Sequence, residues 1–114
     1  MIDLEQMAKE HENLFPNATL ESQVWKLEEE ISEFAEARTD TQRCQECADI
    51  LIVCCGLYRW CPLTARIIFR KYFYDAPSCL NKEIDEEVNR KWQINLKRKW
   101  EWNGKTYHHI GEDE

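Results

Sequence analysis

The segment from Gln45 to Trp60 constrains the fold of this chain most, because it is apolar on almost every side after Asp49. Its spacing predicts a helix, and a helix without a polar face has to lie at the centre of a domain, where other elements cover it. The apolar run over residues 48–58 is far shorter than the ~20 residues that a membrane-spanning helix needs. We therefore expect the central helix of a globular domain, and no membrane partner.

The rest of the chain is predicted to form helices that cover this segment. The sequence has only 3 Gly and 3 Pro and no sustained polar/apolar alternation, so helices should dominate. We expect helices over residues 19–37, 63–74 and 80–100, with a polar break at 38–42 and breaks at Pro62 and Pro77. Apolar residues recur at helical spacing in the first (Leu20, Val24, Leu27, Ile31 and Phe34) and in the last (Leu80, Ile84, Val88, Trp92 and Leu96).

Residues 1–114 are expected to form one domain of the all-α class, an antiparallel helical bundle. A chain of 114 residues is long enough for one core and short for two. Its 43% hydrophobic and 32% charged residues are typical of a globular protein. Asn103 and Gly104 predict a turn, and residues 101–114 are expected to form a polar C-terminal tail.

Charge and cysteine content limit the partners and the compartment. A net charge of −7 argues against a nucleic-acid partner, because affinity for the phosphate backbone comes from clustered Lys and Arg. The first residues carry acids and no apolar signal region, and Cys54 and Cys55 are adjacent within the apolar run. We expect a cytoplasmic protein with reduced thiols.

Two groups of acids at helical spacing form the informative pattern. On the helix predicted over 19–37, Glu33 lies roughly 60° from Glu30 and roughly 40° from Glu29, because an α-helix turns by about 100° per residue. On the central helix, Glu46 and Asp49 have the same i, i+3 relation and lie at the start of the apolar run. Buried carboxylates need a partner, and a hard cation such as Mg²⁺ with all-oxygen ligands would supply one. The acid run alone is also compatible with a merely solvated helix face.

These motifs resemble the signature of the all-α nucleoside triphosphate pyrophosphohydrolases of the MazG type, E-E-x-x-E followed by E-x-x-D. In this chain they read EEISE at residues 29–33 and ECAD at residues 46–49. The resemblance spans about residues 20–57 and extends to Lys91, Asn95 and Arg98, which are similar to the family's late K-x-x-x-N-x-x-R segment. The basic, aromatic segment 63–74 departs from the family's shorter connection.

The resemblance implies a function and assigns roles by position. The metal ligands would be Glu30, Glu33, Glu46 and Asp49, binding Mg²⁺ or, as a substitute, Mn²⁺. Glu29 would contact these ligands rather than the metal itself, or would bind a second metal ion. Lys91, Asn95 and Arg98 would hold the departing pyrophosphate. The reaction implied is hydrolysis of an NTP or dNTP between the α and β phosphates to a nucleoside monophosphate and pyrophosphate, which cleanses or adjusts the nucleotide pool. The bundle would be completed as a homodimer or homotetramer.

Other residues allow more than one interpretation. Trp25 lies roughly 40° from Glu29 on the helix, so it could stack on a nucleobase of the substrate or pack against another subunit. Cys44 and Cys47 have the spacing of a zinc or thiol site, with no second such pair. His108 and His109 could contact phosphate or metal, or be solvated.

The basic residues of segment 63–74, which are Arg66, Arg70 and Lys71, could meet the triphosphate or the acidic surface of another subunit. The rival to an enzyme is a catalytically silent helical oligomerisation module that keeps its acids for metal or partner binding. A zinc or thiol sensor built on Cys44 and Cys47 is the third hypothesis.

Overall fold

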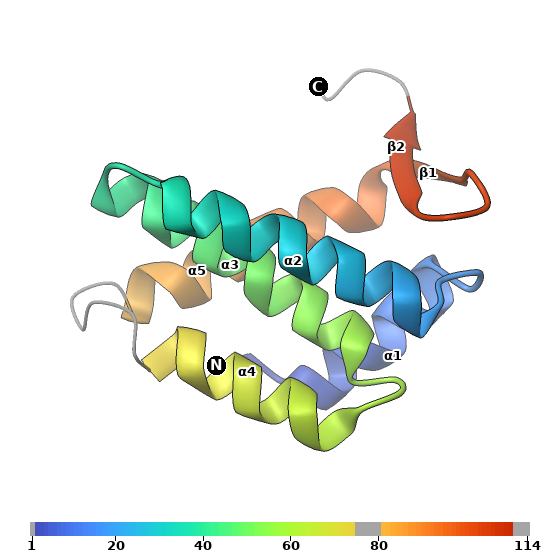
Figure 1. Ribbon diagram of the computed structural model, residues 1–114, viewed down its shortest axis with the longest axis horizontal. Helices are drawn as coiled ribbons and strands as arrows, with labels where there is room; N and C mark the ends of the chain where they lie inside the picture. The colour runs from blue at the N-terminus through green and yellow to red at the C-terminus, as the bar shows by residue number, and fades with distance from the viewer. Residues whose placement is uncertain (1, 75–80, 111–114) are drawn as a thin grey trace.

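The computed structural model describes residues 2–74 and 81–110, and this part of the chain is mostly helical (Figure 1). The elements follow in the order α1 (Leu4–Leu14), α2 (Leu20–Glu36), α3 (Asp40–Leu57), α4 (Pro62–Tyr74), α5 (Asn81–Lys97), β1 (Lys99–Trp102) and β2 (Tyr107–Ile110). The predominance of helices is confirmed, and a two-stranded sheet is added to it. In the described part, no helix is both long and apolar enough to span a membrane.

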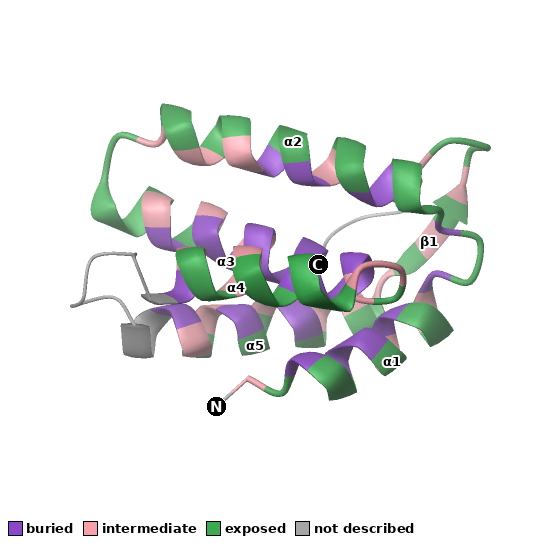
Figure 2. Cartoon of the chain, turned by 60° about the horizontal axis from the view of Figure 1, so that its bottom comes forward, coloured by how far each residue is buried: buried purple, intermediate pink, exposed green. Residues whose placement is uncertain are grey.

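Helix α3 lies at the centre of the fold, as its sequence predicts. It packs against each of the other four helices, and Figure 2 shows that most of its length is buried. Leu51 and Cys55 join a core cluster with residues of α1 and α5, whereas Ile50 and Cys54 join a second cluster with residues of α2 and α4. All four of these side chains are fully buried. A helix without a polar face is thus covered from opposite sides.

The ends of α3 differ from the prediction. The helix begins at Asp40 rather than Gln45, because the side chain of Thr39 caps it by accepting a hydrogen bond from the Gln42 N–H. Residues 40–42 of the predicted break at 38–42 lie instead in the first turn of the helix, where they are exposed. At the other end the helix stops at Leu57 instead of Trp60, and a turn leads to Pro62 at the first position of α4. Helices α2 and α3 are therefore joined by the three residues 37–39.

The other predicted helices lie close to their expected places. Helix α2 starts after the N-cap Thr19 and ends before Ala37, and α4 starts one residue before its predicted beginning. In α5, the side chains of Ile84, Val88 and Trp92 are buried as expected, but Leu96, in the last turn of the helix, is 37% exposed. Leu80 and the predicted break at Pro77 lie outside the described residues.

Helix α1 was not anticipated, although its residues show helical periodicity. Leu4, Met7, Ala8 and His11 are buried at i, i+3, i+4 and i+7, and the Asp3 side chain caps the helix by accepting from the Gln6 N–H at 3.0 Å. A hydrogen bond of 2.8 Å from the indole N–H of Trp92 to Glu10 connects α1 to α5.

The C-terminal region forms a β-hairpin in place of the last turn of the predicted helix 80–100 and of the polar tail at 101–114. Strands β1 and β2 pair antiparallel, with Lys99 opposite Ile110 and Trp102 opposite Tyr107. The predicted turn at Asn103 and Gly104 is present: Gly104 has a φ of 90°, and the Asn103 side chain accepts hydrogen bonds from two backbone N–H groups within the turn. Residues 99–102 follow the alternation of a strand, with both tryptophans half-buried and their neighbours exposed.

Candidate metal centre

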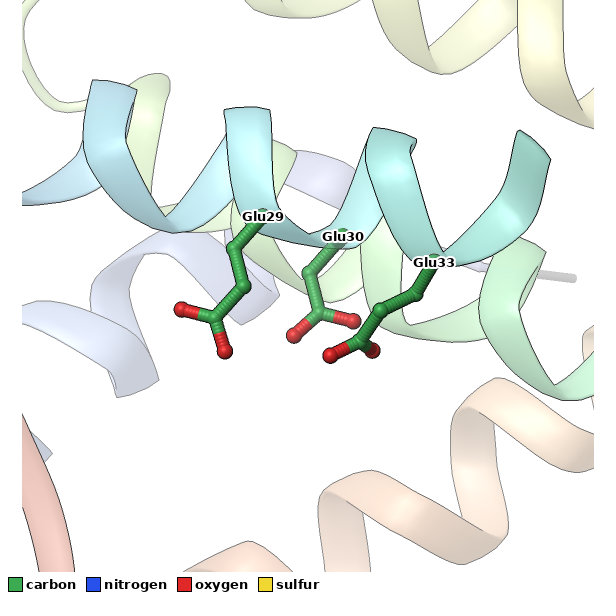
Figure 3. A group of neighbouring side chains, drawn as sticks. All are labelled: Glu29, Glu30 and Glu33. Carbon is green, nitrogen blue, oxygen red and sulfur yellow. The ribbon is translucent and has the colours of Figure 1, made fainter. Parts of the chain in front are cut away.

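The three glutamates of the first motif leave the same side of α2 (Figure 3). Glu29, Glu30 and Glu33 each offer a carboxylate oxygen, and these oxygens lie within 4.8 Å of one another. Glu30 is 7% exposed, whereas Glu29 and Glu33 are exposed. The helix therefore aims one buried carboxylate toward the interior and flanks it with two that reach solvent.

The acids of the second motif meet this group from α3. One oxygen each of Glu30, Glu46 and Asp49 lie within 4.8 Å of one another. The short connection 37–39 makes α2 and α3 antiparallel neighbours, and it is this packing that brings the two motifs together (Figure 1). The structure thus places all five predicted acids in one cluster, which we call the acid cluster: Glu29, Glu30, Glu33, Glu46 and Asp49.

Two oxygens of the acid cluster are buried without a protein partner. Among the described residues, Oε2 of Glu30 and Oε2 of Glu46 have no hydrogen-bond partner. A buried carboxylate oxygen without a partner costs free energy, so the fold carries a local cost here that a bound cation would offset. The donors are all carboxylates, which Mg²⁺ and similar hard cations prefer. On these grounds the acid cluster fits a divalent cation.

Burial and mutual repulsion perturb the titration of the acid cluster. Burial, followed by the charges of Asp49 and Glu33, raises the pKa of Glu30 from 4.5 to about 8, although Lys26 opposes the shift. Burial also raises the pKa of Glu46, to which a hydrogen bond with Glu33 contributes, and it raises the pKa of Asp49 against the effect of Lys91. Without a cation, Glu30 is therefore mostly protonated at neutral pH.

Two lysines offset part of the negative charge. Nζ of Lys91 on α5 lies 2.9 and 3.0 Å from the two carboxylate oxygens of Asp49. Nζ of Lys26 lies 3.7 Å from Glu29 and 3.9 Å from Glu30. Asp49 thus has a basic partner from another helix, which the sequence of α3 alone did not reveal. Five acids against two lysines still leave the site negatively charged.

A cleft of about 340 Å³ opens beside the acid cluster. Glu30 and Asp49 line it together with residues of α5 and of the hairpin. Among the residues predicted to bind substrate, Asn95 and Arg98 line this cleft. Lys91 instead forms an ion pair with Asp49, a member of the acid cluster.

Trp25 lies apart from the cleft lining. Its ring is 38% exposed and carries Nζ of Lys105, from the hairpin turn, at 4.4 Å from the ring centroid. This cation–π contact attaches the hairpin to α2.

The hairpin contributes four residues to the lining of the cleft: Trp100, Tyr107, His108 and His109. His108 and His109 were candidates for contact with phosphate or a metal, and both line the same cleft as Glu30 and Asp49. Trp100 and Tyr107, and Lys26 of α2, are lining residues that the sequence analysis did not propose. The alternation of tryptophans with charged residues at 99–102, followed by Asn-Gly, was the available signal for this strand and turn.

The remaining candidates lie elsewhere. Arg66 and Arg70 line a separate cavity against the start of α1. Cys44 and Cys47 are buried, Cys47 donates to the carbonyl of Tyr72 at 3.0 Å, and burial raises the pKa of the Cys47 thiol to about 12. Such a thiol is a poor metal ligand at neutral pH, and among the described residues each potential metal-binding group consists of carboxylates.

Comparison with protein-family models, with curated proteins and with solved structures finds no match to this chain. The functional argument therefore depends on the residues and their arrangement.

Proposed function

We propose that this protein is a magnesium-dependent nucleoside triphosphate pyrophosphohydrolase of the MazG type. The observation that carries the proposal is the convergence of Glu30, Glu46 and Asp49 from two helices, at the edge of a cleft that also presents cationic and amide side chains. The order and spacing of the two acidic motifs in the sequence support the same function.

The acid cluster would hold the metal through Glu30, Glu33, Glu46 and Asp49, with Glu29 at its exposed edge. When bound, Mg²⁺ supplies neutralisation of phosphate charge and activation of a water molecule for attack on phosphorus. Glu30 would give up its proton on binding, because a carboxylate binds a cation in its charged form. Mn²⁺ could substitute, since it accepts the same oxygen ligands.

The cationic and amide side chains of the cleft would orient the triphosphate. Arg98 and Lys26 present positive charge, and Asn95 presents an amide between the acid cluster and the hairpin. Guanidinium and ammonium groups bind phosphate oxygens strongly and stabilise the charge that develops on a departing pyrophosphate. Lys91 would hold Asp49 in place and, once a cation takes over that carboxylate, could turn to the substrate.

Product analysis tests this function. The protein should be incubated with a panel of NTPs and dNTPs in Mg²⁺ or in EDTA, and the products separated by ion-exchange chromatography. Monophosphate and pyrophosphate in equal amounts, only with the metal, would support the proposal. Diphosphate and phosphate would indicate cleavage at the other bond, and the absence of turnover across the panel would favour the non-catalytic oligomerisation module.

We also propose that a second copy of the chain completes the bundle, in a homodimer or homotetramer, and that the enzyme works in the cytoplasm on the nucleotide pool. Leu63 and Ile67 on α4 are 72% and 61% exposed, which is unusual for large apolar side chains one turn apart. The described cysteines are all free, as a reducing compartment would keep them. Sedimentation analysis of the wild type and of a Leu63→Lys variant would show whether this face mediates assembly.

A further inference from the structure

A second cavity, of about 100 Å³, adjoins the cleft beside the acid cluster. The two cavities share Lys26, Asn95, Trp100 and Tyr107 among their lining residues, so they lie side by side. We call this second cavity the ring pocket. It lies between the end of α1, the start of α2 and the hairpin.

The walls of the ring pocket are aromatic and held in fixed positions. The ring of Phe15 lies with its centroid 4.9 Å from those of both Trp100 and Tyr107. The indole N–H of Trp100 donates to the carbonyl of Asn95 at 2.9 Å, and the hydroxyl of Tyr107 accepts from the Asn17 N–H at 2.9 Å. Rigid aromatic walls bind a planar ring at low entropic cost.

The polar groups of the ring pocket are mostly uncharged. Gln23, Ser22 and His11 line it and are 8%, 2% and 6% exposed. Burial and the charge of Arg59 lower the pKa of His11 to about 4, so its imidazole is neutral at pH 7 and offers one donor and one acceptor. Lys26, which is charged, lies toward the acid cluster, where it contacts Glu30.

The amide of Gln23 has hydrogen-bonding capacity to spare. The hydrogen bond that the described residues give it is a long one, 3.5 Å from its Nε2 to the hydroxyl of Ser22. A side-chain amide can donate two hydrogen bonds and accept two. The amide of Gln23 is therefore able to form further hydrogen bonds with a ligand that enters the pocket.

We propose that the ring pocket binds the nucleobase of the substrate, and that the amide of Gln23 recognises the hydrogen-bonding edge of that base. This inference rests on the proposed function, because the acid cluster next to the pocket would hold the triphosphate of the same molecule. A nucleobase is planar, uncharged at neutral pH and edged with donors and acceptors, which matches the walls and the polar groups of the pocket. At about 100 Å³ the ring pocket is smaller than the cavity of about 150 Å³ that accommodates benzene, so a base would enter it by one edge and extend into the adjoining cleft of about 340 Å³.

Nucleoside binding tests the pocket without metal or phosphate. Adenosine, guanosine, cytidine, uridine and free ribose should be titrated in EDTA and followed by saturation-transfer NMR. At least one nucleoside should bind with its base protons in closest contact, and ribose should not. If no nucleoside binds, or if ribose binds equally well, the inference is overturned whatever the protein does with triphosphates.

A variant identifies the residue that reads the base. Gln23→Met keeps the length of the side chain and removes its hydrogen-bonding groups, so the Kd for the preferred nucleoside should rise about 3- to 10-fold, as loss of one hydrogen bond predicts. Gln93→Met is the matched control, because Gln93 is exposed on α5 and lines neither cavity. Unchanged binding in a folded Gln23→Met protein would refute the role of Gln23.

Hydrolysis assays separate this inference from the proposed function. Wild-type protein should cleave its preferred nucleotide with a higher kcat/KM than inorganic tripolyphosphate, which has no base. Nucleoside binding without any hydrolysis would uphold the pocket and overturn the proposed function. Equal cleavage of nucleotide and tripolyphosphate would uphold hydrolysis and overturn the pocket.

Discussion

Replacing Glu30 by Gln should stabilise the metal-free protein as the pH rises above neutrality. In the folded chain, burial and neighbouring acids raise the pKa of Glu30 from 4.5 to about 8. Between these two values the folded state holds a proton that the unfolded state has lost, so the free energy of unfolding falls as the pH increases. The stabilising contribution is complete below about pH 4.5 and is lost as the pH rises to about 8.

The size of this effect follows from the shift. At 1.36 kcal/mol per pKa unit, the wild-type protein should lose at most about 2.5 kcal/mol from this group between pH 6 and pH 8.5. For a domain of this size the loss corresponds to roughly 10 °C in Tm. Gln cannot ionise, so the Glu30→Gln protein should not show this loss.

Urea unfolding in EDTA at pH 6, 7, 8 and 8.5 would measure the difference. Glu28→Gln is the matched control, since Glu28 lies exposed on the same helix, and its curve should follow that of the wild type. Adding Mg²⁺ at pH 8.5 should stabilise the wild type more than Glu30→Gln, because the variant binds the cation more weakly. Parallel pH curves for wild type and Glu30→Gln would refute the assignment of Glu30 as the buried member of the acid cluster.

Further variants test the core, the site and the hairpin. Leu51→Ala, at a fully buried position of α3, should lower the free energy of unfolding by about 2–5 kcal/mol. Gln93→Ala, at an exposed position of α5, should change it by less than about 0.5 kcal/mol, with both measured in urea. Asp49→Asn should reduce the rate of pyrophosphate release by at least about 100-fold while circular dichroism shows an unchanged fold. Tyr107→Phe removes the hydrogen bond from the Asn17 N–H and should lower Tm by a few degrees, equivalent to about 1 kcal/mol.

The central helix and the acid cluster could be predicted from the sequence because each depends on local periodicity. Because residues 45–60 lack a polar face, α3 is expected at the centre of the fold, however the other helices are arranged around it. Glu30 and Glu33 are one turn apart on α2, as Glu46 and Asp49 are on α3, and a short connection between the helices is enough to bring both pairs together. The meeting of the two pairs of acids could therefore be predicted from the residues of α2, α3 and their connection alone.

The hairpin and the pairing of Lys91 could not be predicted in the same way. Trp100 continues the helical pattern of α5 as well as it fits the alternation of residues 99–102, and its contact with Phe15 at the end of α1 favours the strand. Lys91 and Asp49 are far apart in sequence and meet because α5 packs on α3. The ring pocket depends on both of these arrangements, so it appears only in the folded structure.

Calorimetric titration of the protein with Mg²⁺ at pH 7, in two buffers of different ionisation enthalpy, tests the central claim most directly. The acid cluster should bind the ion and release about one proton, because Glu30 is protonated before the cation arrives. The Glu30→Gln variant should bind more weakly and release no such proton. Absence of binding, or binding that Glu30→Gln leaves unchanged, would contradict a metal centre at this site.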